Sequence, residues 1–138
     1  MARTSLAGYQ RQYGSNGKSA TPSVGLQCVQ FDFDPTQASA SVSKTLPAGC
    51  IPLFAQVIVG GATGGASPTV DIGISGTTDG FADEAAANAY SGLLTTGSLM
   101  GTALTADTVI QAGAGASAAT GGTVTVGIYY IMVDDGNS

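Results

Sequence analysis

The sequence predicts an all-β protein, a jelly-roll-like antiparallel β-sandwich with an extended N-terminal arm. Large apolar residues occur in short runs where they alternate with polar ones, which is typical of strands with one buried face. Gly-rich segments separate these runs, and a single segment has helical character. No repeat of 20–50 residues occurs, which argues against solenoids and propellers. We expect an arm over residues 1–25 and a sandwich domain over residues 26–138.

The composition favours a lean domain that assembles with other protein. Ala, Gly, Ser and Thr make up about half of the 138 residues, and only 9% are charged. Such a surface is mostly small side chains, hydroxyls and backbone, which suits permanent contact with other subunits. The alternative is an extracellular β-domain whose strands are coated with Ser and Thr.

The arm is predicted from its basic charge and its lack of periodicity. All four basic residues lie in the first 44, against two acids there, whereas the remaining chain has seven acids and no base. Such dilute charge favours an acidic protein surface over nucleic acid. The alternative is an unanchored terminus. The candidate contact residues of the arm are Arg3, Tyr9, Arg11, Tyr13 and Lys18.

The first half of the domain contains four predicted strands. The first begins at Leu26 and ends before Pro35, and the fourth alternates most regularly. Their expected ranges are Leu26–Phe33, Ala38–Leu46, Ile51–Val59 and Thr69–Ser75.

The second half contains one predicted helix and three predicted strands. An Ala-rich segment preceded by Asp79, a candidate N-cap, predicts a short helix. The helix is expected over Phe81–Tyr90, and the strands over Leu99–Leu104, Thr108–Ala112 and Thr123–Val133.

The last strand is predicted to be apolar on both faces in its second half. One face begins with Thr123, Thr125 and Gly127 and then becomes apolar. A sheet normally leaves one face in water, so this end is expected to be covered by another segment or by another subunit. We predict an oligomer interface at Tyr129, Ile131 and Val133.

The residue types argue against an enzyme, a cofactor or a bound metal. There is no histidine, which excludes the Ser-His-Asp triad and most zinc sites. Gly17-Lys18-Ser19 lacks the first glycine of a P-loop, and two acid pairs, at 32/34 and 134/135, show no sign of a cleft. A loose calcium site remains open among Asp71, Asp79, Asp83 and Glu84.

Two further features concern the compartment. Residues 1–15 lack the apolar core of a signal peptide, and no run is long enough to span a membrane. We therefore expect Cys28 and Cys50 to be buried thiols, with pairing left open.

Several segments resemble small structural proteins of tailed bacteriophages, a group that includes head decoration (cement) proteins and head-fibre bases. The resemblance covers roughly residues 26–133. Its segments are LPAGCIP at 46–52, VIV at 57–59, TVDIGISG at 69–76, TDGFA at 78–82 and the final strand at 121–133.

The resemblance implies a jelly-roll-like homotrimer that binds the major capsid protein on the outer surface of the virion, after assembly in the host cytoplasm. It implies no catalytic residue, nucleic-acid partner or membrane partner. The capsid contact would fall to the arm with Arg3, Arg11 and Lys18. The alternative is a head-fibre or tail receptor-binding module.

Overall fold

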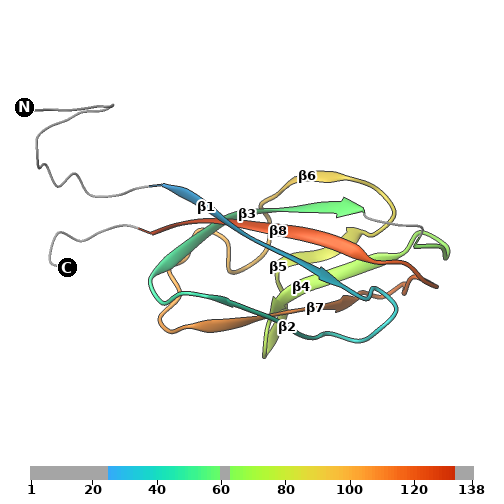
Figure 1. The fold of residues 1–138 in the computed structure, drawn as a ribbon, viewed down its shortest axis with the longest axis horizontal. Helices are drawn as coiled ribbons and strands as arrows, with labels where there is room; N and C mark the ends of the chain where they lie inside the picture. The colour runs from blue at the N-terminus through green and yellow to red at the C-terminus, as the bar shows by residue number, and fades with distance from the viewer. Residues whose placement is uncertain (1–24, 60–62, 133–138) are drawn as a thin grey trace, which may run out of the picture. The chain divides into compact units, whose positions relative to one another are not determined.

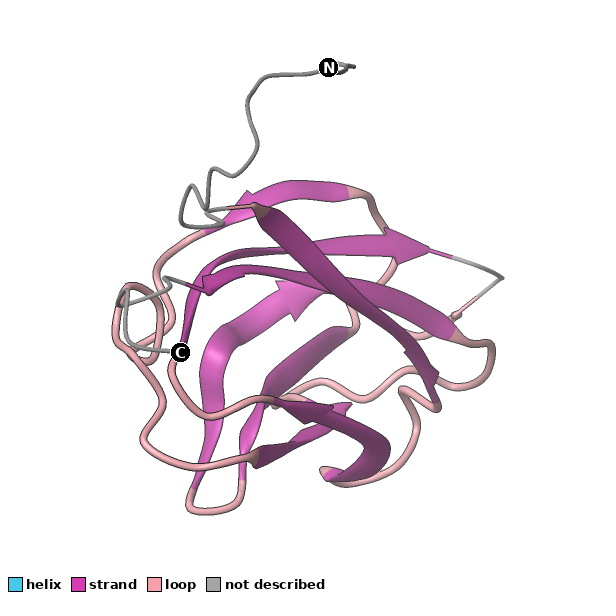
Figure 2. Cartoon of the chain, turned by 60° about the vertical axis from the view of Figure 1, so that its left-hand side comes forward, coloured by secondary structure: helices cyan, strands magenta, loops and turns pink. Residues whose placement is uncertain are grey.

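The computed structural model describes residues 25–59 and 63–132, which form eight strands (Figure 1). Within these ranges there is no helix, and hence none that is long and apolar enough to cross a membrane (Figure 2). The strands are β1 Leu26–Phe33, β2 Ala40–Leu46, β3 Cys50–Val59, β4 Thr69–Ile74, β5 Thr77–Ala86, β6 Ser91–Leu94, β7 Thr108–Ala114 and β8 Val124–Met132.

The strands form two four-stranded antiparallel sheets. Their orders are β1-β8-β3-β6 and β2-β7-β4-β5. The chain changes sheet at every connection except the one between β4 and β5. This alternation places sequence neighbours in opposite sheets, and the two sheets confirm the predicted all-β antiparallel sandwich.

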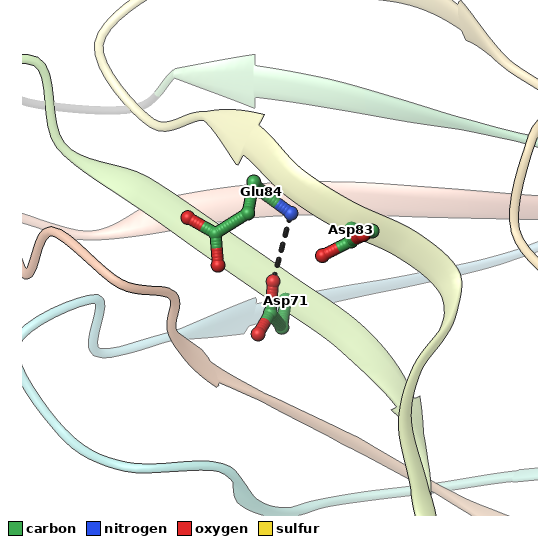
Figure 3. A group of neighbouring side chains, drawn as sticks. All are labelled: Asp71, Asp83 and Glu84. Atoms are coloured by element: carbon green, nitrogen blue, oxygen red, sulfur yellow. Dashed lines mark hydrogen bonds between the residues drawn. The ribbon is translucent and has the colours of Figure 1, made fainter.

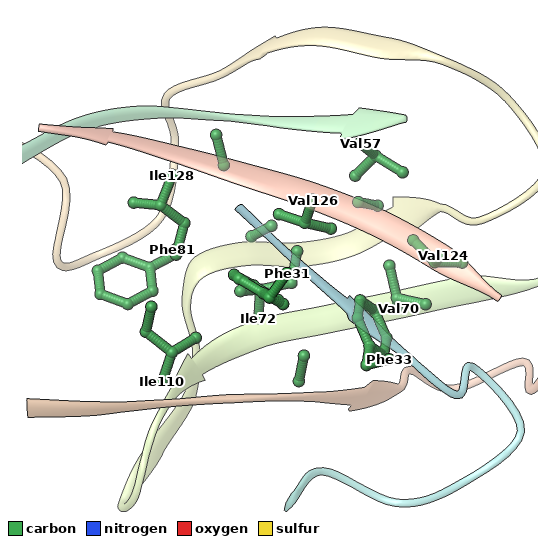
Figure 4. Packing of buried hydrophobic residues seen from close by; sticks show 14 of the residues in the cluster. Phe31, Phe33, Val57, Val70, Ile72, Phe81, Ile110, Val124, Val126 and Ile128 are labelled. Carbon is green, nitrogen blue, oxygen red and sulfur yellow. The ribbon is translucent and has the colours of Figure 1, made fainter. Parts of the chain in front are cut away.

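One hydrophobic core lies between the sheets (Figure 4). Alternate residues of β1 and β8 point into it, as the pleat requires. Phe31 and Phe33 come from β1, and Ile128 comes from β8. Ile72 and Ile110 contribute from the opposite sheet. The predicted alternation of the first and last strands is therefore confirmed.

The helix predicted over 81–90 is wrong, because most of this segment lies in strand β5. β5 pairs with β4, and Phe81 and Ala82 are buried between the sheets. The ladder shifts register twice, and Glu84 adopts a left-handed backbone with φ of 54°. A bulge interrupts the alternation of a strand, so the apolar spacing here resembled that of a helix.

Two other differences involve the same part of the chain. The strand predicted over 99–104 is a series of turns, in which Leu104 exchanges backbone hydrogen bonds with Gly49 and Cys50. Strand β6 was not predicted, because it has only four residues and its Leu93 is exposed, so it shows no alternation of apolar and polar residues.

Candidate interaction surface

The outward side chains of β1, β8 and β3 align in rows across the sheet. Ile131 is the register partner of both Leu26 and Ile51. Tyr129 is likewise the partner of both Cys28 and Phe54. Because directly opposed residues share a face of the sheet, these two rows form one continuous apolar surface.

The second row is ordered by stacking and hydrogen bonds. The rings of Phe54 and Tyr129 stack with centroids 4.5 Å apart and planes 14° from parallel. The Tyr129 hydroxyl donates to Gln56 Oε1 at 2.9 Å, and Gln56 Nε2 donates to the Tyr90 hydroxyl at 2.9 Å. A hydrogen bond with Cys28 and the nearby thiol charge raise the pKa of Tyr129. The Tyr129 hydroxyl therefore stays protonated at neutral pH.

We call this surface the outer apolar face, and we define it by five residues: Leu26, Ile51, Phe54, Tyr129 and Ile131. Four of them are half-buried, and Leu26 keeps 57% of its surface exposed. Leu93 in the neighbouring strand β6 is 70% exposed. Apolar side chains left in water in one region of a surface are typical of an interaction site.

The face becomes polar toward the other end of β8. The next row joins Gln30, Gly127 and Gln56, and the row after it joins Asp32 and Thr125 with Ile58. Asp32 accepts a hydrogen bond from the Thr125 hydroxyl at 2.7 Å.

The predicted interface residues have separate outcomes. Tyr129 and Ile131 lie side by side on the outer apolar face, where Leu26, Ile51 and Phe54 join them. Val133 lies outside the described residues. The apolar run at 51–59 was visible in the sequence, but its facing depends on a register shift between Pro52 and Phe54 that the sequence does not reveal.

The outer face of the other sheet is mostly polar or small by comparison, although Val109 of β7 is 46% exposed there. Gln111 of β7 is the register partner of Ser41 and Gly73, and Asp71 pairs with Gly113. The sandwich therefore presents two chemically different faces.

The predicted contact residues of the arm, Arg3, Tyr9, Arg11, Tyr13 and Lys18, lie outside the described residues. Of the expected arm over 1–25, only Gly25 is described.

Three of the four acids considered for calcium come together (Figure 3). Carboxylate oxygens of Asp71, Asp83 and Glu84 lie within 4.8 Å of one another, and Asp79 is not in this group. Hydrogen bonds already use carboxylate oxygens of Asp71 and Glu84. Asp71 Oδ1 accepts from the Glu84 N–H at 2.8 Å, and the Glu84 carboxylate accepts from the Thr69 hydroxyl and from the backbone N–H of Ala116. Through these bonds, Asp71 and Glu84 act as a clamp on the β5 bulge.

The cysteines differ from the prediction in one respect. Cys28 and Cys50 are both free thiols, and Cys50 is buried as expected, which raises its pKa. Cys28 is exposed, because it points outward on edge strand β1 while Cys50 points into the core. The expectation of two buried thiols is therefore wrong for Cys28.

The described residues thus form an antiparallel sandwich with one apolar outer face. No model of a protein family matches the chain, and no curated protein matches it in sequence. Among solved structures, it is similar to a chain of the cyanophage Pam1 capsid asymmetric unit, with a TM-score of 0.57 and 18% identity. The likeness covers 92% of this chain and 97% of that chain, and it shows a shared fold.

Proposed function

We propose that this chain is a capsid decoration (cement) protein of a tailed bacteriophage, which binds the outer surface of the head and stabilises the shell without catalysis. The observation that carries the proposal is the likeness to a chain from a phage capsid asymmetric unit. The likeness extends over nearly all of both chains, so the two are of similar length. The small size of the chain, 138 residues, favours an accessory role in the capsid.

We propose two separate contacts, one between copies of the chain and one with the capsid. The outer apolar face joins copies of the chain into an oligomer, because burial of its apolar rows against another subunit is favourable. We propose that this oligomer is a trimer. The basic arm with Arg3, Arg11 and Lys18 contacts the major capsid protein. A standard interface buries about 1,600 Å², and many copies on one shell multiply the stabilisation.

The proposal is tested with heads of the cognate phage that lack this protein. Adding the purified chain should produce co-sedimentation with the heads and raise the temperature at which they release DNA. A variant with Arg3, Arg11 and Lys18 changed to Ser should bind more weakly, with a smaller effect of added salt. Heads that neither bind the chain nor gain heat resistance would contradict the proposal.

The second candidate is a head-fibre or tail receptor-binding module. It is favoured by Tyr90, which is 64% exposed and hydrogen-bonded to the Gln56 amide. An exposed ring beside an amide is a chemistry that binds sugars. A glycan-array signal that is lost in Tyr90→Ala, together with no binding to heads, would favour this function over decoration.

A further inference from the structure

Strand β1 is an edge strand without the usual protection of an edge. It ends the sheet order β1-β8-β3-β6, and all eight of its residues pair with β8 in unbroken register. It contains no Pro and no basic residue, and its one charge, Asp32, is hydrogen-bonded to Thr125 of its own sheet. Alternate backbone N–H and C=O groups of such a strand point away from the sheet and can pair with another chain.

The other three edges in the described part of the chain are each blunted. Strand β6 has only four residues. Strand β2 breaks register between Ser41 and Thr45, where Ser43 has a φ of 60° and Lys44 adds a charge. Strand β5 has two register shifts and carries Asp79, Asp83 and Glu84. Short length, bulges and charge are the devices that prevent edge pairing. Strand β1 is neither short nor bulged, and Asp32 is its only charged residue.

A groove runs beside this unprotected edge, between β1 and β2. It consists of two adjoining hollows of about 360 Å³ and 350 Å³ that share Asp32. We call it the edge groove and define it by Gln30, Asp32, Asp34, Ala38, Ser41 and Lys44. A strand added to a sheet lies about 4.8 Å from its neighbour, so a segment paired with β1 would lie over this groove.

We propose that the edge groove binds the N-terminal arm of a second copy of this chain, which adds a strand to β1. Residues 1–24 carry three basic residues and no acid, whereas residues 25–138 carry one base and nine acids. The groove carries Asp32 and Asp34 against Lys44, a net charge of −1, so it is complementary in charge to the basic arm. The arm also contains the alternating series Tyr9, Arg11 and Tyr13, which would place large side chains on one face of a strand.

The length of the arm permits exchange between copies. Residues 1–24 can extend over roughly 80 Å at about 3.3 Å per residue, which exceeds the size of one domain. An arm of this length can therefore reach strand β1 of a second copy.

The test is disulfide trapping in the full-length chain. Gln30→Cys in a Cys28→Ser background places one thiol on the outer side of β1, and single cysteines are then introduced in turn at positions 8–13. Strand pairing opposes residues of the same face, so cross-linking should be strong at every second position and weak between them. Mixing isotopically light and heavy copies shows by mass spectrometry which copy supplies each thiol.

Mixed light–heavy cross-links with the two-residue alternation would support the proposal. Cross-links only within one copy, or equal cross-linking at all positions, would overturn it. Asp32→Lys should reduce the yield several-fold and Arg11→Asp should restore part of it, while Asp79→Lys serves as a control outside the groove. The proposal concerns the free protein, on which trapping is measured, whereas the capsid contact proposed for the same arm concerns the assembled head. Its failure leaves the co-sedimentation result unaffected.

Discussion

At the scale of single residues, the clamp at the β5 bulge links backbone strain to charge. Glu84 holds a φ of 54°, which is uncommon for a residue with a side chain. Its N–H is bonded to Asp71, and its carboxylate is bonded to Thr69 and Ala116. These contacts fix the conformation, but they also bring two carboxylates close together. Burial and repulsion raise the pKa of Asp71, whereas hydrogen bonds lower the pKa of Glu84. The contributions of the two acids to stability should therefore change with pH in opposite directions.

Asp71→Asn should stabilise the protein at neutral pH. Burial, together with repulsion from nearby acids, raises the pKa of Asp71 above its ordinary value of 3.8, although the Glu84 N–H opposes this. The folded state therefore binds the proton more tightly, and its stability falls as pH rises through that window. Asn keeps the acceptor without the charge. Urea unfolding should show an advantage for Asn at pH 7 that disappears below pH 3.8. An equal advantage at both pH values would contradict this cause.

Glu84→Gln should have the opposite dependence. Hydrogen bonds from the Thr69 hydroxyl and the Ala116 N–H lower the pKa of Glu84 below its ordinary value of 4.5. That stabilisation is complete above the ordinary value and is lost as pH falls through the lowered one. The variant should therefore have a lower melting temperature than the parent at pH 7 and a similar one in strong acid. A deficit that grows on acidification would refute the assignment.

At the scale of elements, one glycine permits the connection between β1 and β2 to lie against β7. A Cβ on Gly113 would lie 2.4 Å from the backbone nitrogen of Ser39. Gly113→Ala should therefore destabilise the domain by about 1–3 kcal/mol, as expected for overpacking. Gly121 is a matched control, because a Cβ there meets nothing within 4 Å. Chemical denaturation of both variants measures the difference. Equal midpoints would show that the backbone at Ser39 moves to accommodate the added methyl group at little cost.

The elements that were predicted correctly are those with large residues and an unbroken alternation. Strand β1 was predicted with its observed bounds, and β8 to within one residue at each end that is described. Strand β5 was missed because Ala has a weak preference for strands, and because its bulges remove the two-residue period. Pairing with β4 and burial of Phe81 outweigh that local preference.

The candidate site was predictable only in part, for a similar reason. The second apolar face of the last strand was visible in Tyr129 and Ile131. Their partners across the sheet depend on which strands are neighbours and in which register. Leu26 lies more than 100 positions from Ile131 in the chain, yet the two are directly opposed. Such a pairing is set by the whole fold.

At the scale of the molecule, the difference between the two outer faces predicts how copies associate. Ile131→Lys places a charge in the first row of the outer apolar face and should shift the protein from oligomer to monomer in native mass spectrometry. Gln111→Lys, on the outer face of the other sheet, is the matched control and should leave the mass unchanged. An Ile131→Lys protein that is folded but has the parent's mass would exclude this face as the interface.

The pairing of β1 with β8 also has a consequence for synthesis. The first strand of the domain cannot complete its ladder until the last strand has been translated. Contacts so distant in sequence give a high contact order and slow folding. A nascent chain therefore leaves the ribosome with an unpaired Phe-containing strand, and in a cell that makes many copies this strand competes for partners on other chains. A chain truncated before β8 would lose a central strand of one sheet, so the domain can fold only after β8 has been synthesised.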